Sequence, residues 1–568
     1  MGFRLASAAF VAVFATYLFL GGMGVTDRGN PEAREAPYNL LARGLLSGHL
    51  YVAREAPPGL AALADPYDPG ANSLFRDDPR YRLHDFSYYR GRLHLYFGVV
   101  PALLVFIPFH LLTGAWLPHW AAVVLLCSAG VLVNLSLVRA VRRSEFPQAP
   151  PWADAACVLV LGFGSYGPLL AARADLWEIP IATSYLLVSA ALRCLWEATG
   201  DSARPARWIA AASAALGLAF AARPTALPNA AILLVPFFAA GLRANARAWL
   251  AAVLPIALCG AAVAAYNALR FGGALDFGQR YQLASVYVAK LRLFSPSYVP
   301  VNLWLYLLEP VRWSAPFPFA HEPPLAEIRG RLPPGHGGVE QISGLLVYAP
   351  VLWAAAAVPV ALRAWGAGRR LALIAASAAW VAASSLAILS FFFGTCSRYQ
   401  FEFAPALALL ASVGIVAMEA RTGGILRRAL RCAWAAALVA TCAFTLLYGI
   451  ERCASDHNRY GIGRLVQRDV AGAQAEFDTA NALSPGNALS RLGTSMILEA
   501  EGRGEDARRD LEALARDYPD DALAHFTLAN LLMRSGRAQE ALGHYRIAHR
   551  LDPGNEAIGR ALAAAERH

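Results

Sequence analysis

LASAAFVAVFATYLFLGGMGVT, residues 5–26, is the stretch that decides the fold. It holds no Asp, Glu, Lys or Arg and is long enough to cross a bilayer as a helix. The mostly polar residues 27–94 follow it directly, and long hydrophobic segments then resume. The stretch is too long for a signal-peptide core and lacks an A-x-A cleavage site, so we expect a retained membrane anchor.

The composition is that of a polytopic membrane protein. Hydrophobic residues make up 57% of the 568 residues, and charged residues only 16%. The formal net charge is +10, but Lys290 is the only lysine, and many arginines stand in short clusters between hydrophobic segments. Such clusters control membrane topology, so the charge does not indicate a nucleic-acid partner.

The hydrophobic pattern predicts an all-α fold of about eleven spans. They are residues 5–26, 118–138, 155–172, 178–196, 208–222, 225–242, 248–269, 341–362, 371–393, 401–419 and 432–450. Segment 97–114 is short and holds two prolines, and we expect it to be an interfacial or re-entrant helix.

The arginines predict the orientation. With the N-terminus inside, every inner loop carries arginine, and the positive-inside rule is met in all five loops. These residues are Arg139, Arg142, Arg143, Arg204, Arg207, Arg243, Arg247, Arg363, Arg369, Arg370, Arg421, Arg427, Arg428 and Arg431. Eleven spans then place the C-terminus outside, and two long outer loops fall at 27–117 and 270–340.

The C-terminal region 451–568 repeats with a period of 34 residues. Pro485, Pro519 and Pro553 keep this spacing, as do Ala473, Ala507 and Ala541. The last unit closely resembles the tetratricopeptide repeat, in which paired helices stack into an α-solenoid. A concave surface for a protein partner is the usual function, and a stabilising appendage is the alternative. The domains predicted are therefore 1–450 in the membrane and 451–568 as repeats.

The eight cysteines show no C-x-x-C spacing. Cys396 and Cys453 both fall on the predicted outer side, where an oxidising compartment would permit a bridge. We therefore treat a Cys396–Cys453 disulfide as a hypothesis.

Several short motifs share the predicted outer side. They are YNLLARGLLSGHLY (38–51), HDFSYYRGRLHLYFG (84–98), ARPT (222–225), LRFGGALDFGQRYQL (269–283) and SRYQFEF (397–403). Their order and topology over residues 1–450 resemble the GT-C superfamily of membrane glycosyltransferases, in its branch of protein mannosyltransferases and lipid A aminoarabinose transferases. The resemblance implies a polyprenyl-phosphate sugar donor bound from the outer face of a bacterial cytoplasmic membrane. The repeats, which eleven spans place outside, would then be periplasmic.

The resemblance also implies a catalytic carboxylate just after the first span. Asp27 is the first acid after the membrane and is the preferred base. Glu35 directly precedes the YNLLARG segment and is the closest competitor, and Glu32 and Asp85 follow. Each could instead be a solvated loop residue or a turn cap.

Two further sets of residues suit such a reaction. Arg223, Arg280 and Arg398 lie at the outer membrane edge and could bind the donor phosphate, although such arginines are also common lipid anchors. Asp175 and Glu178 in ARADLWEI could join a first-loop acid around Mg²⁺ or Mn²⁺, since these ions prefer oxygen ligands.

Two other classes remain open. One is an O-antigen ligase or polymerase-like protein, although that class keeps its large outer loop late in the chain. The other is a non-enzymatic membrane scaffold that displays the repeats, although a scaffold does not need acids and arginines clustered on its outer loops.

Overall fold

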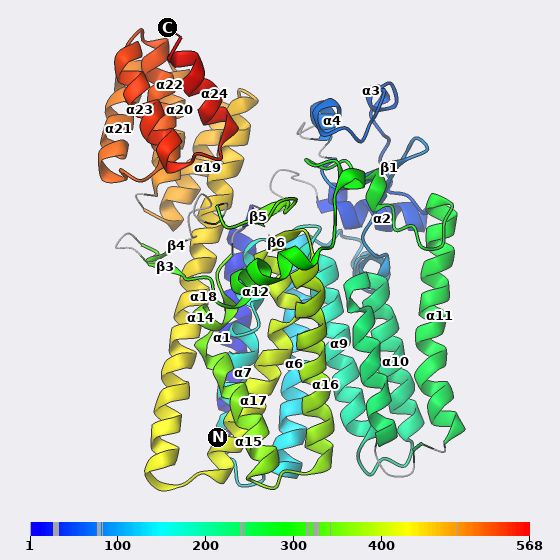
Figure 1. Cartoon of the computed structure of the whole chain (residues 1–568). Coiled ribbons are helices and arrows are strands. Elements are labelled where there is room, and N and C mark those ends of the chain that lie inside the picture. The colour runs from blue at the N-terminus through cyan, green and yellow to red at the C-terminus, as the bar shows by residue number, and fades with distance from the viewer. Residues whose placement is uncertain are drawn as a thin grey trace.

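The computed structural model describes residues 2–25, 33–76, 81, 83–238, 242–243, 245–313, 317–321, 328, 330–340, 342–485 and 487–567. A long helical bundle carries a smaller helical domain at one end (Figure 1). The described elements are almost all helices, and the three small sheets have two strands each. The all-α prediction is confirmed.

Eight of the described helices are long and apolar enough to cross a membrane. They are α1 (Gly2–Met23), α6 (His119–Glu145), α9 (Glu178–Ala198), α10 (Pro205–Ala222), α11 (Ala246–Phe271), α16 (Arg369–Phe391), α17 (Ala404–Arg421) and α18 (Gly424–Val466). Each covers one of the predicted spans.

Shorter apolar helices occupy the other three predicted spans. They are α7 (Ala153–Phe163), η3 (Pro224–Phe238) and the pair η7 (Pro350–Ala356) and α15 (Ala357–Arg363). Segment 97–114, expected to be an interfacial or re-entrant helix, forms η2 (Ala102–Phe106) and α5 (Ile107–Thr113). Together they are shorter than any of the eight helices that could cross a membrane. The count of eleven spans stays a prediction.

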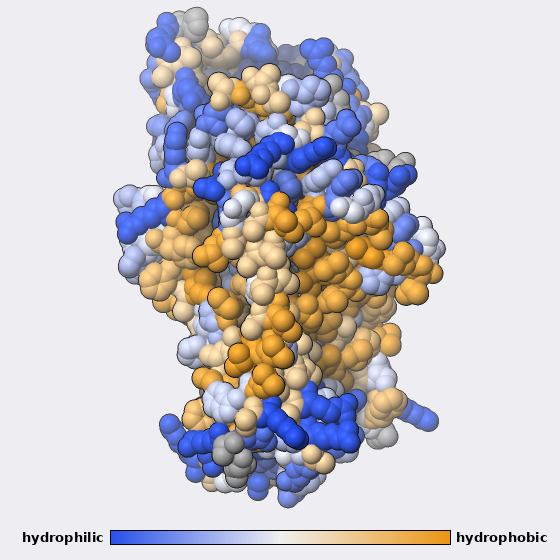
Figure 2. Space-filling model, turned by 90° about the vertical axis from the view of Figure 1, so that its right-hand side faces the viewer, coloured by the Kyte–Doolittle hydropathy of each residue, from blue (hydrophilic) through white to orange (hydrophobic). Residues whose placement is uncertain are grey.

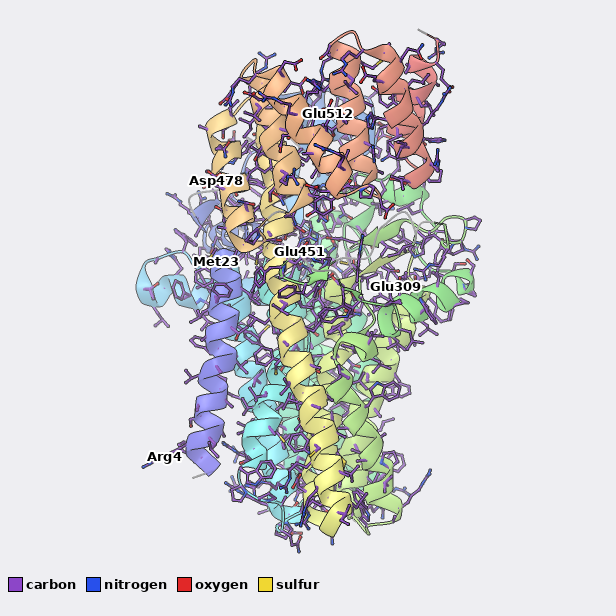
Figure 3. The ribbon with its side chains drawn as sticks, turned by 90° about the vertical axis from the view of Figure 1, so that its left-hand side faces the viewer. Arg4, Met23, Glu309, Glu451, Asp478 and Glu512 are labelled. Atoms are coloured by element: carbon purple, nitrogen blue, oxygen red, sulfur yellow. The ribbon has the colours of Figure 1, made fainter. Side chains whose placement is uncertain are left out.

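The bundle has an apolar belt between two polar ends (Figure 2). Arg4 marks one end of α1, and Met23 marks the other end, next to the repeats (Figure 3). We call the end at Met23 the repeat side and the end at Arg4 the opposite side. This distribution is the one expected of helices held in a bilayer.

Short helices and three strand pairs cover the repeat side of the bundle. The helices are η1 (Ala33–Glu35), α2 (Pro37–Leu46), α3 (Pro58–Ala61), α4 (Pro69–Arg76), α8 (Gly167–Ala172), η4 (Gln279–Tyr281), η5 (Val288–Lys290), η6 (Pro296–Tyr298), α12 (Val299–Leu307), α14 (Leu345–Tyr348) and η8 (Ser397–Glu402). The antiparallel pairs are β1 (Phe86–Tyr89) with β2 (Arg92–Leu95), and β3 (Arg312–Trp313) with β4 (Ala320–His321). The parallel pair is β5 (Gly338–Glu340) with β6 (Gly394–Cys396).

The first outer segment packs on the protein. The ring of Tyr38 on α2 stacks on Phe106 at 5.5 Å, and the Tyr38 N–H donates to His119 Nε2 at 3.3 Å. Tyr38 and Leu41 are fully buried. The buried face of α2 therefore covers the membrane domain rather than lying on lipid.

The repeat domain continues directly from the last long helix. α18 runs without a break past residue 450, where the sequence predicts a domain boundary, and its final turns pair with α19 (Val470–Leu483) as the first repeat. The later helices are α20 (Ala488–Ala500), α21 (Gly504–Asp517), α22 (Ala522–Arg534), α23 (Ala538–Leu551) and α24 (Glu556–Ala565). Arg468, Gly502 and Gly536 hold the same turn with positive φ. The shared turn shows that the end of α18 is the first helix of repeat one.

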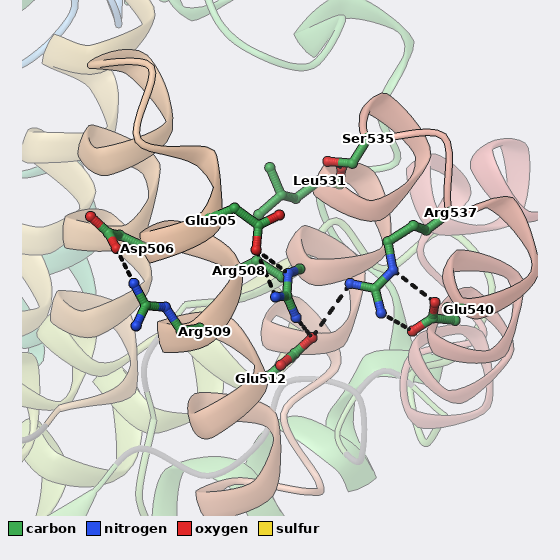
Figure 4. Close-up of polar contacts among 9 residues, drawn as sticks. All are labelled: Glu505, Asp506, Arg508, Arg509, Glu512, Leu531, Ser535, Arg537 and Glu540. Carbon is green, nitrogen blue, oxygen red and sulfur yellow. Dashed lines mark hydrogen bonds and ion pairs between the residues drawn. The ribbon is translucent and has the colours of Figure 1, made fainter.

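Ion pairs lie along the helices of the later repeats, most of them between residues three or four apart in the sequence (Figure 4). Arg508 binds Glu505 at 2.7 Å and Glu512 at 2.6 Å, and Arg537 binds Glu540 at 2.6 Å. Solvent-exposed pairs of this kind add little stability each. We therefore attribute the solenoid's stability to its apolar core, which includes Leu511, Leu528 and Tyr545 on successive helices.

Buried contacts fix the first repeat to the end of α1. His457 on α18 lies within 2.9 Å of the Met23 carbonyl oxygen and 2.6 Å of Glu476 on α19. Cys453 donates to the Leu20 carbonyl, while Cys396 donates to Glu340. Neither thiol is part of a disulfide, so the hypothesis of a Cys396–Cys453 bridge is wrong: each thiol donates to a different partner.

Candidate functional site

A polar cavity of about 510 Å³ opens on the repeat side of the bundle. Five segments far apart in sequence line it, and three of them belong to the motifs HDFSYYRGRLHLYFG, LRFGGALDFGQRYQL and SRYQFEF. The lining residues include His84, Asp85, Tyr96, Trp177, Gln279, Gln282, Glu340, Thr395, Cys396, Arg398 and Tyr399. The fold thus brings three separate motifs to one space.

Asp85 stands at the base of the β1–β2 hairpin. Arg90 and Gly91 form its two-residue turn, and both have positive φ, as the tightest hairpin turns require. Asp85 itself has a φ of 64°, which is uncommon for a residue other than glycine. Its carboxylate accepts hydrogen bonds from Trp177 Nε1 at 2.7 Å and from Gln282 Nε2. These donors hold the carboxylate at the cavity, so Asp85 does more than cap a turn.

Arg398 is the principal cation of the cavity. Its side chain is buried, and its Nη1 donates to Glu340 Oε2 at 2.8 Å. The parallel pairing of β5 with β6 places Glu340 opposite Cys396, two residues before Arg398. Glu340 also pairs with Arg173, and both guanidinium groups lie over the Trp177 ring. The Nε of Arg398 is buried and has no hydrogen-bond partner among the described residues.

Arg223 approaches the same place from α10. Its guanidinium lies 5.3 Å from the centre of the Tyr399 ring, and that of Arg398 lies 5.4 Å from the same ring. Arg223 also donates from Nε to Glu402 at 2.5 Å, and the Thr225 hydroxyl donates to that carboxylate at 2.8 Å. Two predicted phosphate-binding arginines therefore meet at Tyr399, although one of them is already paired.

Arg280 stands apart from these two. Its side chain is 62% exposed, pairs with Asp276 at 2.5 Å and stacks on Tyr281. Its neighbours Gln279 and Gln282 line the cavity, but Arg280 does not. The structure does not bring it together with Arg223 and Arg398.

Glu35 forms ion pairs with two arginines of the first outer segment. Its two oxygens accept from Arg43 at 2.7 Å and from Arg54 at 3.1 Å. Burial raises the pKa of Glu35, but the hydrogen bonds from Arg54 and Arg43 outweigh it and hold the pKa below its ordinary value. A carboxylate held in this way is a weak proton acceptor, and its contacts explain it as the anchor of the first outer segment.

Asp27 and Glu32, the other first-loop candidates, lie outside the described residues. The described chain stops at Val25, beyond the end of α1, and resumes at Ala33 in η1. Their assignment as catalytic carboxylates stays a prediction.

Asp175 and Glu178 lie close together at the start of α9. Asp175 accepts from the Leu176 N–H at 2.7 Å and lies 3.7 Å from His119, while Glu178 is fully buried and accepts from the Asp175 N–H at 3.0 Å. Among the residues that the structure describes, no three His, Cys, Asp or Glu side chains converge to hold a metal ion. These two carboxylates therefore do not form the predicted metal site by themselves.

The sequence does not predict four residues that contribute to the cavity. Three of them, Trp177, Gln282 and Tyr399, stand inside a motif or loop that the sequence singles out, so their position could have indicated a role in the site. Glu340 had no such signal. It reaches the site only because β5 pairs with β6 across a long stretch of sequence.

We expect His94 to make the free energy of unfolding sensitive to acid. It is buried on β2, with its ring 5.1 Å from that of Phe271. Burial, helped by Arg270, lowers its pKa to about 4 from 6.5. The folded state therefore disfavours the proton. The contribution of neutral His94 to stability is complete above pH 6.5, falls as the pH drops from 6.5 to 4, and amounts to about 3 kcal/mol.

His94→Gln should reduce this acid sensitivity, because the amide does not titrate. The thermal unfolding midpoint of the purified protein, measured at pH 7 and pH 4.5, should fall less in the variant than in the wild type. An equal fall in both proteins would show that other groups govern acid unfolding.

The repeat domain matches known sequences. The tetratricopeptide repeat family matches residues 496–556, which confirms the predicted repeats. Anaphase-promoting complex subunit 7 of Arabidopsis thaliana is 33% identical over 95 residues, and the match covers 17% of this chain and 17% of that protein. The chain thus spans less than a fifth of the length of the curated relative that it matches.

Two solved structures show a distant similarity to this chain. ArnT from Cupriavidus metallidurans, bound to undecaprenyl phosphate, gives a TM-score of 0.43 at 14% identity, over 96% of this chain and 77% of that chain. AglB, the oligosaccharyltransferase of Archaeoglobus fulgidus, solved with an inhibitory peptide and a dolichol-phosphate, gives 0.37 at 12% identity, over 80% and 58%. Likenesses of this size assign neither an activity nor a ligand to this chain.

Proposed function

We propose that this protein is a membrane glycosyltransferase that moves a sugar from a polyprenyl-phosphate donor to an envelope acceptor on the repeat side. The supporting observation is the cavity in which Asp85 and Arg398 face one space at the end of an apolar bundle. A lipid-linked sugar has its phosphate at the membrane edge and its chain in the bilayer. The cavity suits its polar end, and the motifs of the GT-C resemblance supply both residues.

The proposed reaction needs one proton acceptor and one anion site. A carboxylate accepts the proton of the acceptor hydroxyl while the oxygen of that hydroxyl bonds to sugar C1. The C1–O bond to phosphate breaks, and polyprenyl phosphate leaves as an anion. Arg398, with Arg223 beside the same tyrosine, stabilises the negative charge that develops on this leaving group.

Asp27 is our choice for the proton acceptor. Gly24, three residues before it, is so close to Ala172 that an added Cβ would lie 2.6 Å from the Ala172 carbonyl oxygen. Ala172 is followed by Arg173, which pairs with Glu340 of the cavity lining. In the sequence, Asp27 follows Val25, the last described residue of this segment, by two residues. Asp85 is the alternative, and no step of this reaction depends on a metal.

The orientation follows from the arginines on the opposite side. We propose that this side is cytoplasmic and that the repeats lie outside a bacterial cytoplasmic membrane, where they bind a protein partner. Alkaline phosphatase fused after His568 should be active, and green fluorescent protein at the same position should be dark. The reverse result would contradict the orientation.

Donor recognition can be tested with the carrier alone. The purified protein in detergent should bind polyprenyl phosphate and be stabilised against heat by it. Polyprenol, which has the same chain without the phosphate, should bind much more weakly, because the cavity offers guanidinium groups to an anion. Equal binding of the two lipids would contradict the proposed phosphate site.

A further inference from the structure

A groove between α6 and α9 lies on the opposite side of the bundle, far from the cavity. Its volume is about 260 Å³. Arg139, Arg143 and Arg193 line one part, and Leu132, Leu135 and Ala140 line the other. Both helices run from the repeat side toward the opposite side, and all three arginines stand within the last two turns of their helices, which end at Glu145 and Ala198. The groove therefore joins a cationic end to an apolar wall that continues into the membrane belt.

The charges in the groove are not balanced by the protein. Asp154 accepts from both Arg139 at 2.9 Å and Arg142 at 2.8 Å, so one carboxylate serves two arginines. Arg193 pairs with Glu197 at 2.5 Å. Four arginines, counting Arg143, thus share two carboxylates.

Arg143 is the cation without a partner. It is exposed, and the described residues offer it no ion pair or hydrogen bond. The nearest acid along the helix, Glu145, accepts instead from the Gly368 N–H at 2.8 Å. Arg139 and Arg143 are four residues apart, so they project from the same face of α6.

The apolar wall is open to the outside of the bundle at Leu132, whereas Leu135 beside it is buried. Leu132 is 46% exposed, which is ordinary for a side chain that faces lipid. An anionic phospholipid matches both parts of the groove, since its phosphate is an anion at the membrane edge and its acyl chain is apolar. Basic grooves between membrane helices bind such head groups, and each arginine near the surface contributes to the attraction.

We propose that this groove binds an anionic phospholipid of the leaflet opposite the repeats, with the phosphate between Arg143 and Arg193 and an acyl chain along the exposed Leu132. A free phosphate ester would use the arginines but not the leucines. The site is separate from the cavity and does not depend on the proposed transferase activity.

Native mass spectrometry of the detergent-purified full chain tests the proposal. The probes are phosphatidylglycerol, phosphatidylcholine as the zwitterionic match, and glycerol 3-phosphate as the head group without chains. We expect phosphatidylglycerol to bind best. R143Q/R193Q should weaken its binding roughly tenfold or more, and R143Q alone about fivefold, because each arginine contributes separately. Arg143 has no partner to lose, so R143Q should fold normally.

The control variant R204Q/R428Q removes two exposed arginines from the same side of the bundle but outside the groove. It should bind phosphatidylglycerol as the wild type does. Equal binding by R143Q/R193Q and the wild type would overturn the proposal, as would an equal loss in the control variant. Glycerol 3-phosphate that binds as tightly as the lipid would show a phosphate site without a lipid.

Discussion

Asp27→Asn is expected to leave the protein folded and to lower the rate of sugar transfer by a factor of about a hundred or more, the usual size of a general-base effect. The amide keeps the shape of the side chain but does not accept a proton. The rate should be measured in membranes containing equal amounts of wild type and variant. Binding of polyprenyl phosphate should change little, because Asp27 acts on the acceptor.

Two further amide substitutions distinguish between the candidate carboxylates. Glu35→Gln should lower the rate of sugar transfer much less than Asp27→Asn does, because Glu35 binds Arg43 and Arg54 and anchors the outer segment. Asp85→Asn brings an NH₂ group against donors from Trp177 and Gln282 and should disturb the cavity wall. Full activity in both Asp27→Asn and Glu35→Gln would contradict our choice and make Asp85 the proton acceptor.

Arg398→Ala is expected to weaken the binding of polyprenyl phosphate by about tenfold to a hundredfold, the range for a lost hydrogen bond to a charged group. Arg398 is buried at the cavity, and its Nε has no partner among the described residues, so it has a donor to offer. Arg398→Lys should restore only part of the affinity, because an ammonium group binds phosphate through one point. Titration of the purified protein with the lipid measures both effects.

Arg280→Ala is the matched control for this prediction. Arg280 carries the same charge on the same side of the bundle, but it is mostly exposed and pairs with Asp276. Its loss should change the affinity about twofold at most, the size expected of an exposed ion pair. Equal losses in both variants, or unchanged binding in Arg398→Ala, would show that the arginines act only through the general field of the surface. Thermal unfolding without lipid separates loss of fold from loss of binding.

The membrane helices and the repeats could be predicted because both are local patterns. A long uncharged run requires a helix, whatever its neighbours are. The period of 34 residues requires stacked helix pairs. The fusion of α18 with the first repeat could not be predicted in this way. The hydrophobic pattern ends near residue 450, whereas the backbone continues as helix to Val466 because Ala480 and Leu483 pack beside Cys453 and Ala454.

The cavity could be predicted only in part. Arg398 and Asp85 stand inside motifs, and the sequence assigned both to the outer side. Glu340 depends on a parallel strand pair between distant loops, and no local pattern encodes that pairing. The exposure of Arg280 and its pair with Asp276 likewise depend on the folded chain and not on any local pattern.

The most direct test of the central claim is mass spectrometry of envelope glycans, glycoproteins and polyprenyl lipids from a deletion strain complemented with either the wild type or Asp27→Asn. We predict that both the deletion strain and the Asp27→Asn strain lose one sugar from a defined envelope acceptor and accumulate the polyprenyl-phosphate sugar, and that the wild type restores the acceptor. Identical glycan and lipid profiles in all strains would contradict the assignment of a glycosyltransferase.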